Sequence, residues 1–169
     1  FAASNSNVVL RNNKIFIVSG GKKSRCFVSE DKGVTWNVYE TPIVQGKTMT
    51  GIFTADFYDE NIGFIAGGDY ENQENNSNNK AITEDGGKTW KLVGQNTGFG
   101  YASCVQFVPN SRGKALVCVG GTGLHYSNDS GKTWLKMLED KDLYTIRFKN
   151  DSVAYAAGKN RVVELKFGK

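Results

Sequence analysis

The chain has 169 residues, enough for one domain with its own hydrophobic core. Its net charge of +4 comes from scattered lysines without an arginine-rich run, which argues against nucleic-acid binding, and no apolar run reaches the roughly 18 residues of a membrane span. The three cysteines, Cys26, Cys104 and Cys118, have no Cys-x-x-Cys spacing, so we expect buried side chains rather than a metal site.

Short runs of β-branched and aromatic residues, separated by Gly- and Asn-rich turns, predict an all-β fold without helices. The first unit predicts strands at Val8–Leu10, Ile15–Ser19, Arg25–Ser29 and Trp36–Tyr39. The second predicts Ile52–Phe57, Gly63–Gly67, Lys80–Thr83 and Trp90–Val93. The third predicts Tyr101–Phe107, Ala115–Val119, Leu124–Ser127 and Trp134–Met137, and the last unit only Leu143–Phe148, Val153–Ala157 and Val162–Lys166.

One octet occurs three times, as SEDKGVTW at 29–36, TEDGGKTW at 83–90 and SNDSGKTW at 127–134. Its aspartate can accept backbone N–H bonds inside a tight turn, its glycine supplies a positive φ, and its tryptophan can bury a ring between sheets. Three aspartates at one spacing favour a structural role over catalysis or calcium binding. The shared positions are Ser29, Asp31, Gly33, Thr35 and Trp36; Thr83, Asp85, Gly87, Thr89 and Trp90; and Ser127, Asp129, Gly131, Thr133 and Trp134.

These three copies resemble the Asp-box, or bacterial neuraminidase repeat. The resemblance implies turns that join the third and fourth strands of β-propeller blades and act as structural staples. Units of about 40–50 residues with four strands are also typical of propellers. We therefore predict one β-propeller domain over residues 1–169, with blades at about 1–40, 41–95, 96–140 and 141–169.

The last unit lacks an outer strand and a copy of the octet, which leaves about three and three-quarter blades. This predicts part of a six- to eight-bladed ring, whose other blades are supplied in cis, in trans or by dimerisation. A small four-bladed ring is the alternative. The first residues, FAASNSNVV, show neither a Met nor a signal peptide, a start that fits a mature chain and a truncated chain equally.

Longer phrases, among them GGTGLHYSNDSGKTW and GIFTADFYDENIGFIAGG, resemble bacterial proteins related to the photosystem II stability and assembly factor, in a secreted Bacteroidetes-type branch. That resemblance implies a secreted or periplasmic location. Proteins of this kind are sometimes labelled oxidoreductases, but no nucleotide, flavin or haem motif is present, so we expect no cofactor.

The innermost strands suggest a ligand site. When TADF, CVQF and TIRF are aligned, Asp56, Gln106 and Arg147 fall at one position. In a propeller these side chains line the central channel, where Asp56 and Arg147 can grip a charged ligand. Alternatively, the three residues line the channel as polar side chains that hold water or form structural pairs.

A second candidate surface is the face that carries the long loops 40–50, 69–78 and 95–100. Tyr70, Phe99, Tyr101 and Lys47 lie on or beside it, and their rings can stack on sugars or a protein partner. Packing between blades is the alternative explanation for Phe99 and Tyr101.

No catalytic residues are predicted. The single histidine, His125, has no metal-ligand or nucleophile partners in its motif. We expect a non-enzymatic scaffold that binds a protein or carbohydrate ligand through the long-loop face and the channel. The alternative is a sialidase-like glycoside hydrolase in which Asp56 is one carboxylate and other site residues lie outside this chain, so enzymatic activity stays open.

Overall fold

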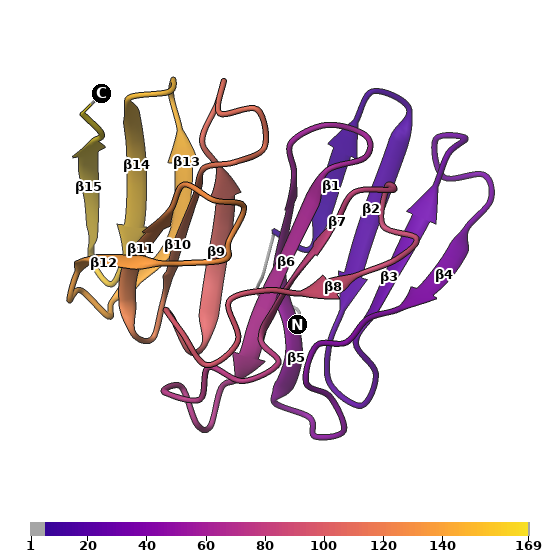
Figure 1. The fold of residues 1–169 in the computed structure, drawn as a ribbon, viewed down its shortest axis with the longest axis horizontal. Helices are drawn as coiled ribbons and strands as arrows, with labels where there is room; N and C mark the ends of the chain where they lie inside the picture. Colours follow the sequence, from indigo (N-terminus) through magenta and orange to yellow (C-terminus); the bar gives the residue numbers. More distant parts are fainter. Residues whose placement is uncertain (1–5, 169) are drawn as a thin grey trace.

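The computed structural model describes residues 6–168, which form β-strands, turns and loops without a helix. Three four-stranded sheets and one three-stranded sheet are arranged side by side like the blades of a fan (Figure 1). The predicted count of about three and three-quarter blades is therefore confirmed. Residues 6–168 contain no helix of the length and apolar character that a membrane crossing requires.

Within each blade the strands pair antiparallel in sequence order. The first blade contains β1 (Val8–Arg11), β2 (Lys14–Ser19), β3 (Arg25–Ser29) and β4 (Asn37–Glu40). The second contains β5 (Thr50–Phe57), β6 (Gly63–Asp69), β7 (Lys80–Thr83) and β8 (Lys91–Leu92). The third contains β9 (Ala102–Phe107), β10 (Leu116–Gly120), β11 (Gly123–Ser127) and β12 (Leu135–Leu138), and the fourth contains β13 (Leu143–Phe148), β14 (Val153–Gly158) and β15 (Arg161–Lys166).

The prediction placed the tryptophan of each octet at the start of a fourth strand. In the structure these three tryptophans belong to the turns instead. Each indole Nε1 donates a hydrogen bond to the carbonyl of the turn glycine three residues earlier, at 3.1 Å for Trp36, 3.0 Å for Trp90 and 2.9 Å for Trp134. This bond fixes the ring against its own turn, so strand pairing begins one residue later.

Apolar side chains fill the space between neighbouring blades. Between the first two blades, the rings of Phe16 and Phe57 stack with centroids 3.6 Å apart. Between the second and third, Phe64 contacts the Trp134 ring edge-on. Burial of these faces holds the fan together, since each sheet is covered by its neighbour. The three cysteines are buried and free, as predicted.

Each repeated octet forms the same hydrogen-bonded turn. In the first, one carboxylate oxygen of Asp31 accepts the Thr35 amide at 2.8 Å and the Ser29 hydroxyl at 2.8 Å, while the other accepts the Thr35 hydroxyl at 2.6 Å. Gly33 has a φ of 91°, which a residue with a side chain rarely adopts. The predicted use of the aspartate and the glycine is confirmed.

These turns predict a loss of stability in acid. Hydrogen bonds from Thr35 and Ser29 lower the pKa of Asp31 from 3.8 to about 2. Burial alone would raise the pKa of Asp85 and Asp129, but the equivalent hydrogen bonds outweigh burial and lower it. Because the folded-state pKa lies below the unfolded one, this stabilisation is complete above the unfolded pKa and is lost as the pH falls through the folded pKa.

The measurement is thermal unfolding at several pH values between about 4 and 2. We expect the triple variant Asp31→Asn, Asp85→Asn, Asp129→Asn to show a shallower decline than the unmodified protein over this window. An unchanged pH dependence in the triple variant would contradict a contribution from these carboxylates.

Candidate functional site

The inner strands of the four blades surround a small pocket. It has a volume of about 190 Å³ and is lined by residues from β1, β5, β9 and β13 and from the segment just before β1. Its polar side chains are those of Ser6, Arg11, Asp56, Gln106 and Arg147. The structure therefore brings the three aligned positions Asp56, Gln106 and Arg147 to one place, and adds Arg11, which the alignment missed.

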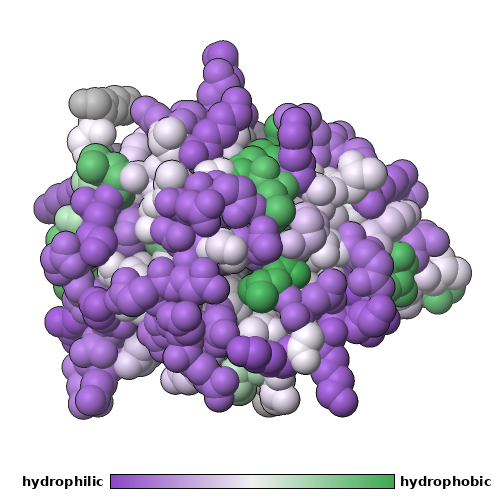
Figure 2. Space-filling model, turned by 60° about the horizontal axis from the view of Figure 1, so that its bottom comes forward, coloured by the Kyte–Doolittle hydropathy of each residue, from purple (hydrophilic) through white to green (hydrophobic). Residues whose placement is uncertain are grey.

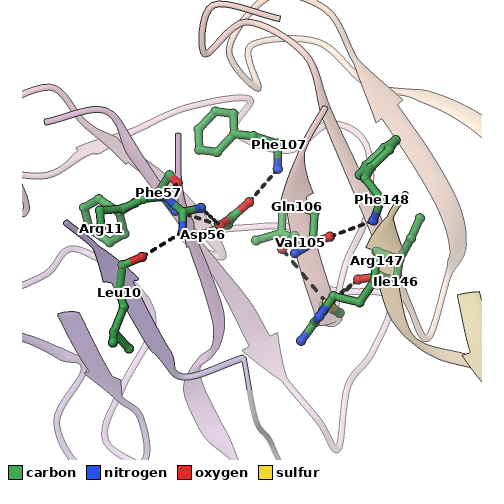
Figure 3. Close-up of polar contacts among 11 residues, drawn as sticks. Leu10, Arg11, Asp56, Phe57, Val105, Gln106, Phe107, Ile146, Arg147 and Phe148 are labelled. Atoms are coloured by element: carbon green, nitrogen blue, oxygen red, sulfur yellow. Dashed lines mark hydrogen bonds and ion pairs between the residues drawn. The ribbon is translucent and has the colours of Figure 1, made fainter. Parts of the chain in front are cut away.

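Asp56 connects three blades (Figure 3). One of its carboxylate oxygens accepts the Phe57 amide at 2.9 Å and lies 2.9 Å from Arg11 Nη2, and the other accepts the Phe107 amide at 2.8 Å. Arg11 also donates through Nε to the Phe57 carbonyl. Burial raises the pKa of Asp56, whereas the Phe107 amide, the charge of Arg11, the Phe57 amide and the charge of Arg147 oppose that rise.

Gln106 repeats this connection one blade further along. Its side-chain oxygen accepts the Phe148 amide at 3.3 Å, as Asp56 accepts the Phe107 amide. The aligned position therefore joins β5 to β9 and β9 to β13. This supports the structural alternative for Asp56 and Gln106.

Arg147 occupies the same position in the fourth blade, but a guanidinium has no acceptor atom for such a bond. Its Nη1 instead donates to the Ile146 carbonyl at 2.7 Å and approaches Cys104 Sγ at 3.2 Å. The side chain remains exposed at the pocket (Figure 3). Arg147 is therefore the predicted channel residue that is most accessible to a ligand.

The three long loops meet on one side of the fan, as expected. The Val44 amide donates to the Asn78 carbonyl at 2.8 Å, and the Asn78 amide donates to Gln95 Oε1 at 3.0 Å. Figure 2, in which the lower side of Figure 1 comes forward, shows a largely hydrophilic surface with isolated hydrophobic groups. Such a surface is better suited to a polar ligand than to a ligand with a broad apolar face.

Of the four loop-face residues, two are accessible. Tyr70 is 47% exposed, and Lys47 lies 3.9 Å from Asp69 at the surface. Tyr101 is 9% exposed, and its ring lies nearly perpendicular to the Tyr70 ring. Phe99 is 1% exposed and packs against the indole of Trp134, so it has no ring surface free for a ligand. Phe99 therefore serves the packing between blades, which was the alternative explanation for this residue.

Sequence reasoning missed a buried lysine between the second and third blades. Lys80 is 1% exposed, its Nζ donates to Asn79 Oδ1 at 2.8 Å, and it lies 4.7 Å from the centre of the Phe99 ring. Burial lowers its pKa from 10.5 to about 8. The repeat contained a signal of this burial. The positions of β3 and β11 that are equivalent to Lys80 carry the buried apolar residues Cys26 and Leu124.

His125 lies near Lys80 and is 2% exposed. Burial, together with the charges of Lys136 and Lys80, lowers its pKa from 6.5 to about 4. Within residues 6–168, its Nδ1 has no hydrogen-bond partner, and no group of three or more His, Cys, Asp or Glu side chains is placed to hold a metal. Its nearest ring is that of Phe99, at 6.0 Å, so the histidine is part of the packing between blades.

No protein-family model matches the chain. Over 125 residues it is 30% identical to the oligoxyloglucan-reducing end-specific xyloglucanase of Emericella nidulans, a match that covers 67% of this chain and 14% of that protein. The chain thus spans about a seventh of that relative.

Solved structures with similar folds include the Niastella koreensis GH74 enzyme, with a TM-score of 0.66 and 18% identity over 92% of this chain and 27% of that one. Another is YCF48 bound to D1 peptide, with a TM-score of 0.58 and 12% identity over 99% of this chain and 55% of that one. Both similarities support the β-propeller fold.

Proposed function

We propose that this chain is a non-enzymatic β-propeller scaffold that binds a protein or glycan ligand at its inner pocket and long-loop face. The observation that carries the proposal is that both oxygens of Asp56 are already bound within the protein. Glycoside hydrolysis usually requires two carboxyl groups about 5–9.5 Å apart across the scissile bond. Among the described residues, Asp56 is the one carboxylate that lines the pocket.

The charge of the pocket favours a ligand with an acidic group. Arg11 and Asp56 form an ion pair, and the positively charged guanidinium of Arg147 is exposed at the pocket beside the Gln106 amide. A guanidinium binds carboxylates through strong, charge-assisted hydrogen bonds. YCF48, which has a similar fold, was solved with a D1 peptide, and this supports a peptide as the ligand class. The repeated turns, which resemble Asp-boxes, are then staples of the scaffold, and a secreted or periplasmic location stays a prediction.

A glycoside hydrolase with part of its active site outside this chain is the second candidate. The 30% identity to a xyloglucanase over 125 residues favours it. In that case Asp56 would have to give up its bonds to two backbone amides and Arg11 before it could act as an acid or base. Release of reducing sugar from xyloglucan oligosaccharides at an ordinary enzymatic turnover, on the order of 1 per second or faster, would overturn the scaffold proposal.

The test uses two labelled peptides, one with alternating Glu and Gly and one with Gln in place of Glu. We expect the acidic peptide to bind more tightly, and Arg147→Ala to weaken its binding by roughly tenfold, because a charge-assisted hydrogen bond contributes about 1.5–3 kcal/mol. Lys114→Ala is the matched control, since Lys114 is exposed on the β9–β10 connection away from the pocket. Equal affinity of the Arg147→Ala variant and the unmodified protein, measured by fluorescence anisotropy, would contradict the pocket assignment.

A further inference from the structure

The junction between the second and third blades differs chemically from the other two junctions. Lys80 of β7 and His125 of β11 are 1% and 2% exposed there, and both contact the ring of Phe99. Nζ of Lys80 lies 4.7 Å from the centre of that ring, and the centre of the His125 ring lies 6.0 Å from it. This junction therefore buries two groups that can carry a positive charge, one from each blade.

The other junctions have apolar side chains at the equivalent positions. Lys80 and His125 lie three and two residues before the first position of their octets, and strand pairing gives the matching position in the fourth blade, which has no octet. The equivalent pairs, each within one hydrophobic cluster, are Cys26 with Ala81 at the first junction and Leu124 with Val163 at the third. Packing alone thus does not account for the two basic residues, because apolar pairs fill the same places.

The immediate surroundings of the two basic groups suit a neutral histidine. Nζ of Lys80 donates to the uncharged Asn79 Oδ1 at 2.8 Å. Nδ1 of His125 has no hydrogen-bond partner within residues 6–168. A buried polar atom without a partner costs free energy, and the cost rises when its group is charged. An imidazolium at this place would bury a charge and leave one of its donors unpaired.

The charges that face His125 are mainly positive. Lys80 acts on it from β7 across the junction, and Lys136 is its paired residue on β12. The acidic group that opposes them is Glu139, whose carboxylate lies 3.1 Å from Lys136 Nζ. On β10, His125 pairs with Cys118, a thiol whose pKa is raised by burial and which is therefore neutral. The segment 95–99 has no charged side chain, so a proton on His125 would add to a positive environment.

The direction of the pH effect follows from this environment. Burial, together with the charges of Lys136 and Lys80, lowers the pKa of His125 from 6.5 to about 4. Because the folded-state pKa lies below the unfolded one, the stability that the neutral histidine contributes is complete above pH 6.5 and is lost as the pH falls through about 4. His125 is the only histidine in the chain, and histidine is the side chain whose ordinary pKa lies between about 5 and 8. A response to mild acid can therefore be traced to one residue.

We propose that the junction between the second and third blades is an acid-sensitive hinge. When His125 takes up a proton, its charge and that of Lys80 repel one another across the junction, and the two blades separate there. The sheets persist, because their hydrogen bonds run between strands of one blade. The first and third junctions stay closed, since apolar side chains occupy their equivalent positions. The hinge requires no ligand, so its test is independent of the proposed function.

The inner strands supply an axis for this movement. Asp56 accepts the Phe107 amide at 2.8 Å, and Thr54 Oγ1 accepts the Val105 amide at 3.1 Å, so β5 and β9 stay joined while the outer strands move. The outer side of the same junction is already hollowed by a groove of about 530 Å³. Residues of both blades line it, among them Ile82 and Val93 of the second and Ser130 and Lys132 of the third.

Each junction contains one cysteine, so the three cysteines report on the three junctions separately. Cys26, Cys118 and Cys104 belong to the hydrophobic clusters of the first, second and third junction and are 0%, 0% and 1% exposed. The probe is 4,4′-dithiodipyridine, which reacts with accessible thiols in mild acid as well as at neutral pH. Mass spectrometry of proteolytic peptides gives the rate at each cysteine, divided by its rate in the urea-unfolded chain at the same pH.

We expect the rate at Cys118 to rise about 20-fold from pH 7 to pH 5, the change produced by a His125 pKa of 6.5 in the open state and about 4 in the closed state. The rates at Cys26 and Cys104 should change far less. An unchanged rate at Cys118 would overturn the proposal. An equal rise at all three cysteines would overturn it as well, because it would show unfolding of the whole domain.

Substitutions trace the response to its residues. His125→Phe introduces the residue that the first blade has at the equivalent position, Phe27, and His125→Gln keeps a polar side chain without a charge. Both should abolish the rise at Cys118. Lys80→Met should reduce it, because the proton on His125 then meets no charge across the junction, whereas Lys22→Met, an exposed lysine between β2 and β3, should leave it unchanged. A rise that persists in both His125 variants would overturn the proposal.

Discussion

Replacing Asp56 with alanine is expected to lower the free energy of unfolding by about 3–5 kcal/mol. The substitution leaves the guanidinium of Arg11 without its carboxylate partner, and it leaves the Phe57 and Phe107 amides without their acceptor. Removing this acceptor costs more than the hydrogen bonds themselves contribute, because the two buried amides stay desolvated, although the Arg11 side chain is 35% exposed and regains some water. Urea unfolding followed by tryptophan fluorescence measures the change.

Two variants make this result interpretable. Asp151→Ala removes an exposed aspartate in the turn between β13 and β14 and should change stability by less than about 0.5 kcal/mol. The double variant Arg11→Met, Asp56→Ala should be more stable than the sum of the two single variants predicts, because it leaves no unpaired charge behind. A cost below about 1 kcal/mol for Asp56→Ala would show that the carboxylate does not hold the blades together.

Lys80→Met is expected to stabilise the protein at neutral pH by about 1–3 kcal/mol. The drop in the Lys80 pKa from 10.5 to about 8 corresponds to a penalty on the order of 3 kcal/mol for keeping the charged amine buried. Methionine keeps the apolar stem and removes the charge. Loss of the hydrogen bond to Asn79 and of the contact with the Phe99 ring offsets part of the gain.

The gain in the free energy of unfolding from Lys80→Met should decrease as the pH rises from 8 to 10.5. Between pH 8 and 10.5 the unfolded chain binds more protons at Lys80 than the folded protein does, so the stability of the unmodified protein rises relative to the variant over this interval. The difference is largest below pH 8 and shrinks as the pH approaches 10.5. Lys91→Met, on the exposed strand β8, serves as control and should show neither effect. A Lys80→Met protein that is less stable than the unmodified one at pH 7 would contradict the prediction.

The position of the three channel residues could be predicted, but their use could not. Alignment of the inner strands placed Asp56, Gln106 and Arg147 in one pocket. Arg11 was missed because it aligns with Tyr58, two positions after Asp56, and its partner lies 45 residues away in the chain. Whether a polar side chain at a strand end meets a ligand or a neighbouring backbone depends on the distance between blades, which no local pattern encodes.

The loop-face aromatics show the same limit. Tyr70 and Phe99 both lie in or beside long loops, yet one is half exposed and the other is buried. Phe99 is buried because the turn of the third blade brings the indole of Trp134 against it. Residue type and loop position alone therefore could not separate a surface ring from a core ring.

What the sequence by itself determined was the repeated turn and the strands around it. The turn closes within eight residues, through bonds such as those from Thr35 to Asp31 and from Gly33 to Ser29, so its geometry follows from residue type and spacing. Only the tertiary structure decided how the blades meet: that Asp56 contacts residues of three blades, and that Lys80 is buried. Those outcomes depend on contacts between residues far apart in the chain, where burial sets the energy of a charge or an apolar group.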